Sequence, residues 1–178
     1  MSLRQTLSMI AAGTLGAPAA LAQSSAAPRV GEPAPLFQGV LADGDPVALQ
    51  DLRGRTVVLY FYPKDDTPGC TKEACGFRDL TPDFEAKGAA IVGISTDPIK
   101  SHIKFRDKYA LPFPLLSDTD HAFSDAVGAW KDKSMYGRVF KAVERTTILV
   151  DENGIVRKVW PKVKVDGHME AVLAEVTG

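Results

Sequence analysis

The chain has 178 residues, of which 45% are hydrophobic and 24% are charged, and this composition and length suit one globular domain rather than two. Its 21 basic and 22 acidic side chains leave a net charge of -1, so nothing in the charge favours nucleic acid or an acidic membrane surface as a partner. Only two cysteines are present, Cys70 and Cys75, which excludes a disulfide-framework scaffold.

The first 22 residues have the pattern of a secretory signal peptide. Arg4 precedes an apolar run over 6–21, and Ala20-Leu21-Ala22 supplies small residues before a cleavage site. A membrane anchor would need about 20 uninterrupted apolar residues, whereas glycine and proline interrupt this run. We therefore expect cleavage after Ala22, a linker over 23–29, and a periplasmic or secreted protein. A disordered alanine-rich tail and an organellar transit peptide are the alternatives.

A βαβ unit is predicted next. The apolar runs 56–62 and 89–95 predict central strands that are covered on both faces. The segment that begins at Pro68 predicts a helix between them, and we expect Pro82 to break or kink it, with Thr81 capping a short second segment. Such a unit is right-handed and its strands are parallel.

The rest of the chain predicts three more helices and a hairpin. The helices are expected at 98–109, 119–127 and 167–176, and the hairpin strands at 146–150 and 155–160. Asp151-Glu152-Asn153-Gly154 is a strong hairpin turn signal, because Asn-Gly tolerates positive φ angles. This order of elements predicts an α/β protein with a thioredoxin-like fold over 30–178, in which helices flank a central mixed β-sheet.

Cys70 is predicted to lie in the first turn of the helix that follows a central strand, where open α/β sheets usually place their sites. Pro68 suits the first helical position, and Thr67 is a candidate cap whose hydroxyl would reach Cys70. Unpaired N–H groups and the helix dipole favour a thiolate there. We therefore interpret Cys70 as a nucleophile rather than an inert buried thiol.

Cys75 follows five residues later. On a helix this spacing separates the Cα atoms by about 8.6 Å, beyond the ~7 Å that a disulfide spans. If the cysteines form a redox couple, the first turns of the helix must unwind. The alternatives are a packing thiol or a two-cysteine metal site. Metal is the weaker alternative, because none of the histidines, His102, His121 and His168, has a close ligand spacing with the pair.

The segment Pro63-x-x-x-Thr67-x-x-Cys70 resembles the active-site signature of peroxiredoxins. The run from Thr67 to Cys75 is similar to the bacterioferritin comigratory protein, or Q-type, subfamily, whose second cysteine lies five residues after the first. Similarity extends from Val30 to the C-terminus. It implies an atypical 2-Cys thiol peroxidase that reduces hydrogen peroxide and organic hydroperoxides. Cys70 would become a sulfenic acid, Cys75 would resolve it as an intramolecular disulfide, and a thioredoxin-like or other thiol donor would reduce the disulfide.

The resemblance also implies roles for Arg145, Thr67 and Pro63, which occupy the positions of the family's active-site arginine, threonine and proline. Cleavage of an O–O bond requires donors for the alkoxide that forms. The Thr67 hydroxyl, the Cys70 N–H and the Arg145 guanidinium would supply them. Arg145 would also hold Cys70 as thiolate, and Pro63 would shield the site from water. Sequence spacing alone would instead favour a surface ion pair between Arg145 and Glu144 or another acid.

Other features are predicted to carry no chemistry. Lys64-Asp65-Asp66 is interpreted as a solvated loop, Trp130 and Trp160 as packing residues, and the stripe Phe77, Leu80 and Phe84 as core. No cofactor, metal, nucleic acid or membrane is expected as a partner, and we expect a monomer, with a weak dimer as the alternative. The rival function is a non-catalytic copper-binding or disulfide-exchange module on the same fold, although such modules use C-x3-C with a distant histidine, or C-x2-C.

Overall fold

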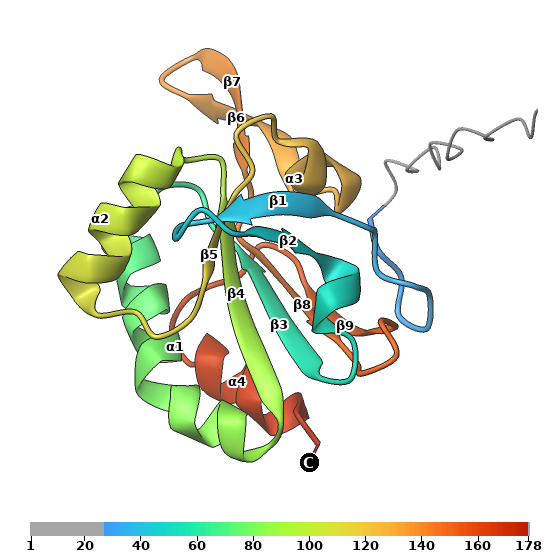
Figure 1. Cartoon of the computed structure of the whole chain (residues 1–178). Helices are drawn as coiled ribbons and strands as arrows, with labels where there is room; N and C mark the ends of the chain where they lie inside the picture. The colour runs from blue at the N-terminus through green and yellow to red at the C-terminus, as the bar shows by residue number, and fades with distance from the viewer. Residues whose placement is uncertain (1–26, 178) are drawn as a thin grey trace, which may run out of the picture.

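The computed structural model describes residues 27–177, so the predicted signal peptide and most of the predicted linker lie outside the described residues. The elements follow in this order (Figure 1): β1 (Gln38–Leu41), β2 (Pro46–Ala48), the 3-10 helix η1 (Leu49–Leu52), β3 (Thr56–Phe61), α1 (Pro68–Ala86), β4 (Ala89–Ser95), α2 (Ile99–Tyr109), β5 (Leu115–Ser117), α3 (Ala122–Ala126), β6 (Trp130–Met135), β7 (Arg138–Val143), β8 (Thr146–Val150), β9 (Val156–Trp160) and α4 (His168–Glu175).

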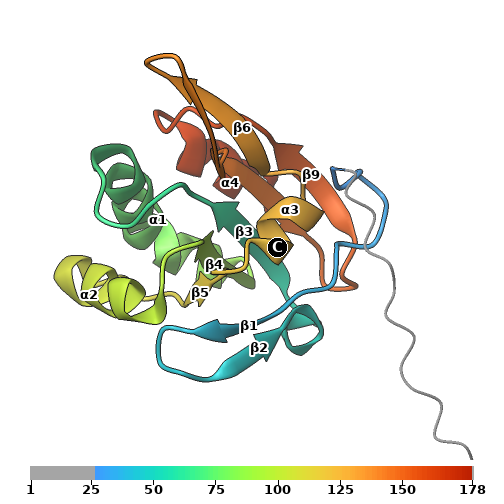
Figure 2. The same ribbon diagram turned by 90° about the horizontal axis from the view of Figure 1, so that it is seen from above.

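Seven strands form one mixed sheet in the order β2-β1-β5-β4-β3-β8-β9. β3 and β5 pair in parallel with β4, whereas β8 pairs antiparallel with β3. Every residue of β3 is buried. Val58 and Tyr60 belong to an apolar cluster that includes side chains of α1, α2 and α4, and Val57 and Leu59 belong to one that includes Phe123 of α3. Figure 2 shows α1 and α2 on the opposite side of the sheet from α3. The predicted βαβ unit and the predicted central mixed sheet flanked by helices are therefore confirmed.

Helix α1 runs through Pro82, so the predicted break and the second segment capped by Thr81 are wrong. Phe77 and Phe84 on the inner face are fully buried, and Leu80 is partly buried against them, as predicted for a core stripe. The Thr81 hydroxyl donates to the Phe77 carbonyl at 2.9 Å, which is a bond made inside a helix rather than at a cap. Packing of this face outweighs the hydrogen bond that proline removes.

The remaining predicted elements are confirmed, with some shifted ends. α2 and α4 begin one residue later than predicted, and α3 is shorter than the predicted 119–127. β8 and β9 form the predicted hairpin. In its turn the Asp151 carboxylate accepts the backbone N–H groups of Asn153 and Ile155, each at 2.9 Å. Of the Asn153-Gly154 pair, only Gly154 has a positive φ, 81°.

Two hairpins were not predicted from the sequence. β1 and β2 pair at one edge of the large sheet, and β6 and β7 form a separate two-stranded sheet that projects from the body (Figure 1). Tyr136 and Gly137 in the β6–β7 turn both have positive φ, as two-residue hairpin turns often require. Apolar side chains on this hairpin are exposed, namely Met135, Tyr136, Val139 and Phe140.

Candidate active site

Cys70 lies in the first turn of α1, as predicted, and is 1% exposed. Thr67 is the N-cap and Pro68 the first helical residue. The Thr71 N–H donates to the Thr67 carbonyl at 2.8 Å and begins the helical hydrogen bonds. The N–H groups of Gly69 and Cys70 precede this bond, so they face the helix end, where they and the dipole favour an anion.

The Thr67 hydroxyl does not cap Cys70, and that prediction is wrong. It donates to the Lys64 carbonyl at 2.9 Å, because the loop turns back at Asp66, whose φ is 56°. The hydroxyl proton is therefore already in use. Thr67 Oγ1 offers only lone pairs to a ligand beside Cys70, so in this arrangement it is a hydrogen-bond acceptor and not the expected donor.

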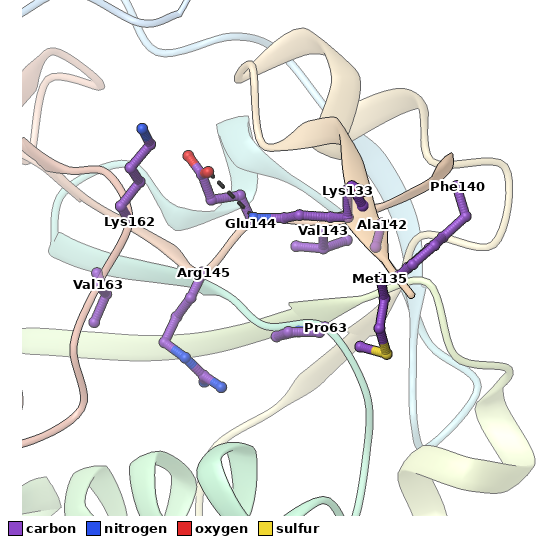
Figure 3. Close-up of a pocket in the computed structure, with 11 residues that line it drawn as sticks. Pro63, Lys133, Met135, Phe140, Ala142, Val143, Glu144, Arg145, Lys162 and Val163 are labelled. Atoms are coloured by element: carbon purple, nitrogen blue, oxygen red, sulfur yellow. Dashed lines mark hydrogen bonds and ion pairs between the residues drawn. The ribbon is translucent and has the colours of Figure 1, made fainter. Parts of the chain in front are cut away.

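Arg145 lies between β7 and β8, and its guanidinium reaches α1. Nη2 donates to Cys70 Sγ at 3.3 Å, and Nη1 donates to the Glu73 carboxylate. The neighbouring Glu144 is bound instead by two lysines of β6, at 2.8 and 3.2 Å. Figure 3 shows Arg145 directed toward α1 while Glu144 is joined to Lys133. The predicted pairing with Glu144 is therefore absent from the described site. Arg145 does pair with another acid, Glu73, but this ion pair is buried rather than at the surface.

Glu73 is a site residue that the sequence did not single out. It is fully buried, and burial raises its pKa to about 7 although Arg145 opposes the shift. Burial lowers the pKa of Arg145, but Glu73 and Cys70 raise it above its usual value overall, so the guanidinium stays charged. The sequence did contain a signal for Glu73. It is an acidic residue beside Ala74, on the face of the predicted helix that also carries Cys70, where an acidic residue is unexpected.

The Lys64-Asp65-Asp66 segment is only partly solvated. Asp65 is buried, where it accepts the Tyr62 hydroxyl at 2.7 Å and lies 2.8 Å from His102 Nδ1. Lys64 and Asp66 are exposed, as predicted. The prediction is therefore wrong for Asp65, because the fold buries it against Tyr62 and against His102 of α2.

Cys75 is partly buried, and both cysteines are free thiols on the uninterrupted helix α1. The predicted need for unwinding before a disulfide forms therefore stands. Among residues 27–177, no group of three His, Cys, Asp or Glu side chains could hold a metal ion. His102 and His168 are buried, and His121 stacks on Trp130 with ring centroids 4.5 Å apart.

An open pocket of about 780 Å³ lies beside Arg145, on the side of the β6–β7 hairpin (Figure 3). Its apolar lining consists of Pro63, Met135, Phe140, Ala142, Val143 and Val163. Arg145 lines this pocket and also contacts Cys70, so the guanidinium links the pocket to the thiol. Within the described part of the chain, no helix is long and apolar enough to cross a membrane.

Comparisons with known proteins agree with one another. Residues 30–159 match the AhpC/TSA family. A Coxiella burnetii bcp protein is 52% identical over 149 residues, which are 84% of this chain and 96% of its own. Peroxiredoxin Bcp of Bacillus subtilis is 44% identical, over 81% of this chain and 92% of its own. A structure of Xanthomonas campestris bacterioferritin comigratory protein, studied for its alkyl peroxide reduction activity, has a TM-score of 0.76 and 44% identity, over 79% of this chain and 89% of that chain.

Proposed function

The chain belongs to the AhpC/TSA family and has its thioredoxin-like peroxiredoxin fold, and from this premise we propose that it reduces hydroperoxides at Cys70. The observation that carries the proposal is the Arg145 guanidinium, held by buried Glu73 with Nη2 on Cys70 Sγ. The peroxiredoxin relatives favour this function over a copper-binding or disulfide-exchange module.

In the first step, the Cys70 thiolate attacks the terminal oxygen of the hydroperoxide. An S–O bond forms, the O–O bond breaks, and its electron pair leaves with the other oxygen as alkoxide or hydroxide, which takes a proton from water. Cys70 is thereby oxidised to a sulfenic acid. The guanidinium and the N–H groups at the helix end stabilise the negative charge that develops on the leaving oxygen. Thr67 Oγ1 accepts the O–H of the attacked oxygen and so orients it.

In the second step, the Cys75 thiolate attacks the sulfur of the Cys70 sulfenic acid. A disulfide forms and the hydroxyl leaves as water after it takes a proton. Because α1 holds the two residues five positions apart, its first turns must open for this step. A thioredoxin-like or other dithiol then reduces the disulfide by exchange and is itself oxidised.

The substrates are hydrogen peroxide and organic hydroperoxides. Organic substituents need an apolar wall near the reacting groups, and the pocket that Arg145 shares with Pro63 and the β6–β7 hairpin offers one, with Met135 and Phe140 among its lining. The alkyl peroxide reduction activity of the Xanthomonas campestris relative supports the same assignment.

Two cysteine variants test the proposed roles. We expect Cys70→Ser to abolish peroxide reduction, because the nucleophile is lost. Cys75→Ser should consume about one equivalent of peroxide and then stall, with a sulfenic or over-oxidised Cys70 detected by mass spectrometry. Circular dichroism of both variants controls for folding. An unreacted Cys70 in folded Cys75→Ser protein would refute the assignment.

We also propose that the protein is exported and that residues 1–22 are removed. The proposal is supported by the apolar run over 6–21 and by Ala20-Leu21-Ala22. Expression of the full chain in a bacterium, followed by fractionation and intact-mass measurement, should give a periplasmic protein that begins at Gln23. Replacing Ala20 and Ala22 by leucine should leave the precursor uncleaved, and an uncleaved, cytoplasmic product of the unaltered chain would contradict export.

A further inference from the structure

A buried polar pair lies beneath the loop that carries Pro63 and Thr67. Asp65 of this loop and His102 of α2 are 2.8 Å apart, measured from Oδ2 to Nδ1. His102 is 0% exposed, and the other oxygen of Asp65 accepts the Tyr62 hydroxyl at 2.7 Å. None of the reaction steps above uses this pair.

Each polar atom of the two side chains has a hydrogen-bond partner. Nε2 lies 3.1 Å from the Leu116 carbonyl, which can only accept, so Nε2 carries a proton. Nδ1 lies 2.8 Å from Asp65 Oδ2, so both ring nitrogens of His102 have a partner. With each of these atoms bonded and both side chains buried, the arrangement is rigid.

One peptide group connects the pair to the peroxide site. The Lys64–Asp65 peptide donates its N–H to Asp97 Oδ2 at 2.8 Å, and its carbonyl accepts the Thr67 hydroxyl at 2.9 Å. The Asp65 side chain anchors the same peptide through His102. The direction of the Thr67 hydroxyl therefore depends on where this peptide is held.

We propose that Asp65 and His102 are positioning residues, which hold the Lys64–Asp65 peptide so that Thr67 directs its lone pairs at the hydroperoxide. This inference rests on the proposed peroxidase function. Breaking the pair displaces Thr67 but leaves Arg145 and the helix end beside Cys70. Peroxide attack should slow while the thiolate remains reactive.

The test follows two reactions of Cys70 in Cys75→Ser protein, single-turnover reduction of hydrogen peroxide and alkylation by iodoacetamide. We expect Asp65→Ala to slow peroxide reduction by about 10- to 100-fold, because small displacements of reacting groups are costly. Alkylation, which does not need Thr67, should change by less than about threefold. Asp107→Ala, at an exposed position of α2, is the matched control and should change neither rate.

The conservative variant Asp65→Asn should recover most of the peroxide rate. Its amide oxygen accepts the Tyr62 hydroxyl, and its NH2 group donates to Nδ1 of a neutral His102 whose Nε2 still bonds Leu116. A peroxide rate as low as that of Asp65→Ala, in folded protein, would contradict the role of these hydrogen bonds.

A double-mutant comparison separates positioning from general loosening of the fold. In a Thr67→Val background, Asp65→Ala should lower the rate of peroxide reduction by less than about twofold. The effects of substitutions at residues that act as a unit do not add. Equal losses of the peroxide rate in both backgrounds, or parallel losses of peroxide reduction and alkylation, would overturn the inference.

If Asp65→Ala does not fold, Asp97→Ala provides a second variant. It frees the same peptide from its N–H side at a half-buried position and gives the same comparison. An inactive parent protein with intact alkylation would overturn the proposed function instead.

Discussion

At the residue scale, Arg145 divides its guanidinium between a thiol and a carboxylate. Nη2 donates to Cys70 Sγ at 3.3 Å, while Nη1 is bound to Glu73, which is buried in α1. A planar guanidinium can bond two groups at fixed angles, which lysine cannot do. Glu73 thus orients the guanidinium that stabilises the thiolate. Because the guanidinium also pairs with Glu73, its positive charge is shared between the carboxylate and Cys70.

We therefore expect Arg145→Met to slow both alkylation of Cys70 and its oxidation by peroxide. The substitution removes a counter-charge from both reactions and a transition-state donor from the second, so oxidation should fall further, by about 100-fold. Rapid-mixing measurements on Cys75→Ser protein give both rates, and Arg138→Met, at an exposed position of β7, is the control.

Removing Arg145 also leaves Glu73 buried without its partner, which destabilises a protein. The double variant Arg145→Met and Glu73→Gln removes both charges and keeps the chemical test clear of unfolding. Unchanged alkylation in the double variant and in Arg145→Met would contradict the role of the guanidinium.

The residues that the sequence predicted best are those whose signal is local. Thr67, Pro68 and Cys70 are neighbours, and helix-start chemistry alone placed the cysteine in the first turn. Asp65 and Glu73 were missed or misjudged because their partners lie 37 and 72 residues away along the chain. A charged residue next to other charges predicts solvation until the fold brings a partner to it.

At the element scale, apolar patterning predicted the buried elements and failed for the exposed ones. β3 and β4 are continuous apolar runs, whereas β6 has no buried residue and β7 has only one, so their sequences lack an alternating pattern. Gly44 and Gly137 have positive φ in the turns of the β1–β2 and β6–β7 hairpins, but a glycine alone does not predict the strands on either side of it. At Pro82 the local signal was misleading, because proline predicted a helix break that does not occur. Burial of Phe77 and Phe84 stabilises the continuous helix.

The same packing predicts where α1 opens during the reaction cycle. Phe77 and Phe84 anchor the later turns in the core, so formation of the Cys70–Cys75 disulfide should unwind 71–76 and leave 77–86 folded. Amide hydrogen exchange should become faster over 71–76 on oxidation. Cys75→Ser protein treated with peroxide is the control and should keep its protection. Equal protection in both redox forms, with the disulfide confirmed by mass, would contradict unwinding.

At the scale of the whole molecule, strand register assembles the site. β3 and β8 are antiparallel, with Phe61 opposite Thr146. The loop that leaves β3 at Tyr62 therefore lies beside Arg145, which immediately precedes β8. The sequence predicted both strands but not their pairing, because register is set by side-chain packing across the sheet. The position of Arg145 at Cys70 consequently came only from the family resemblance.

Two buried groups near this site make stability depend on pH in opposite directions. Burial raises the pKa of Glu73 from 4.5 to about 7, so its contribution to stability is complete below pH 4.5 and is lost as pH rises through 7. Burial, with a smaller effect of Arg145, lowers the pKa of His168 from 6.5 to about 4. Its contribution is complete above pH 6.5 and is lost as pH falls through 4.

The contributions of Glu73 and His168 oppose each other between pH 4.5 and 6.5. Removing one group should therefore reveal the pH dependence of stability that the other group causes. Relative to the parent protein, the free energy of unfolding of Glu73→Gln should rise by on the order of 3 kcal/mol from pH 4.5 to 7, and that of His168→Gln should fall by a similar amount from pH 4 to 6.5. Urea denaturation at several pH values measures both differences. The double variant should differ from the parent by a nearly constant amount between pH 4.5 and 6.5. A difference that does not change with pH in either single variant would contradict the pKa assigned to that group.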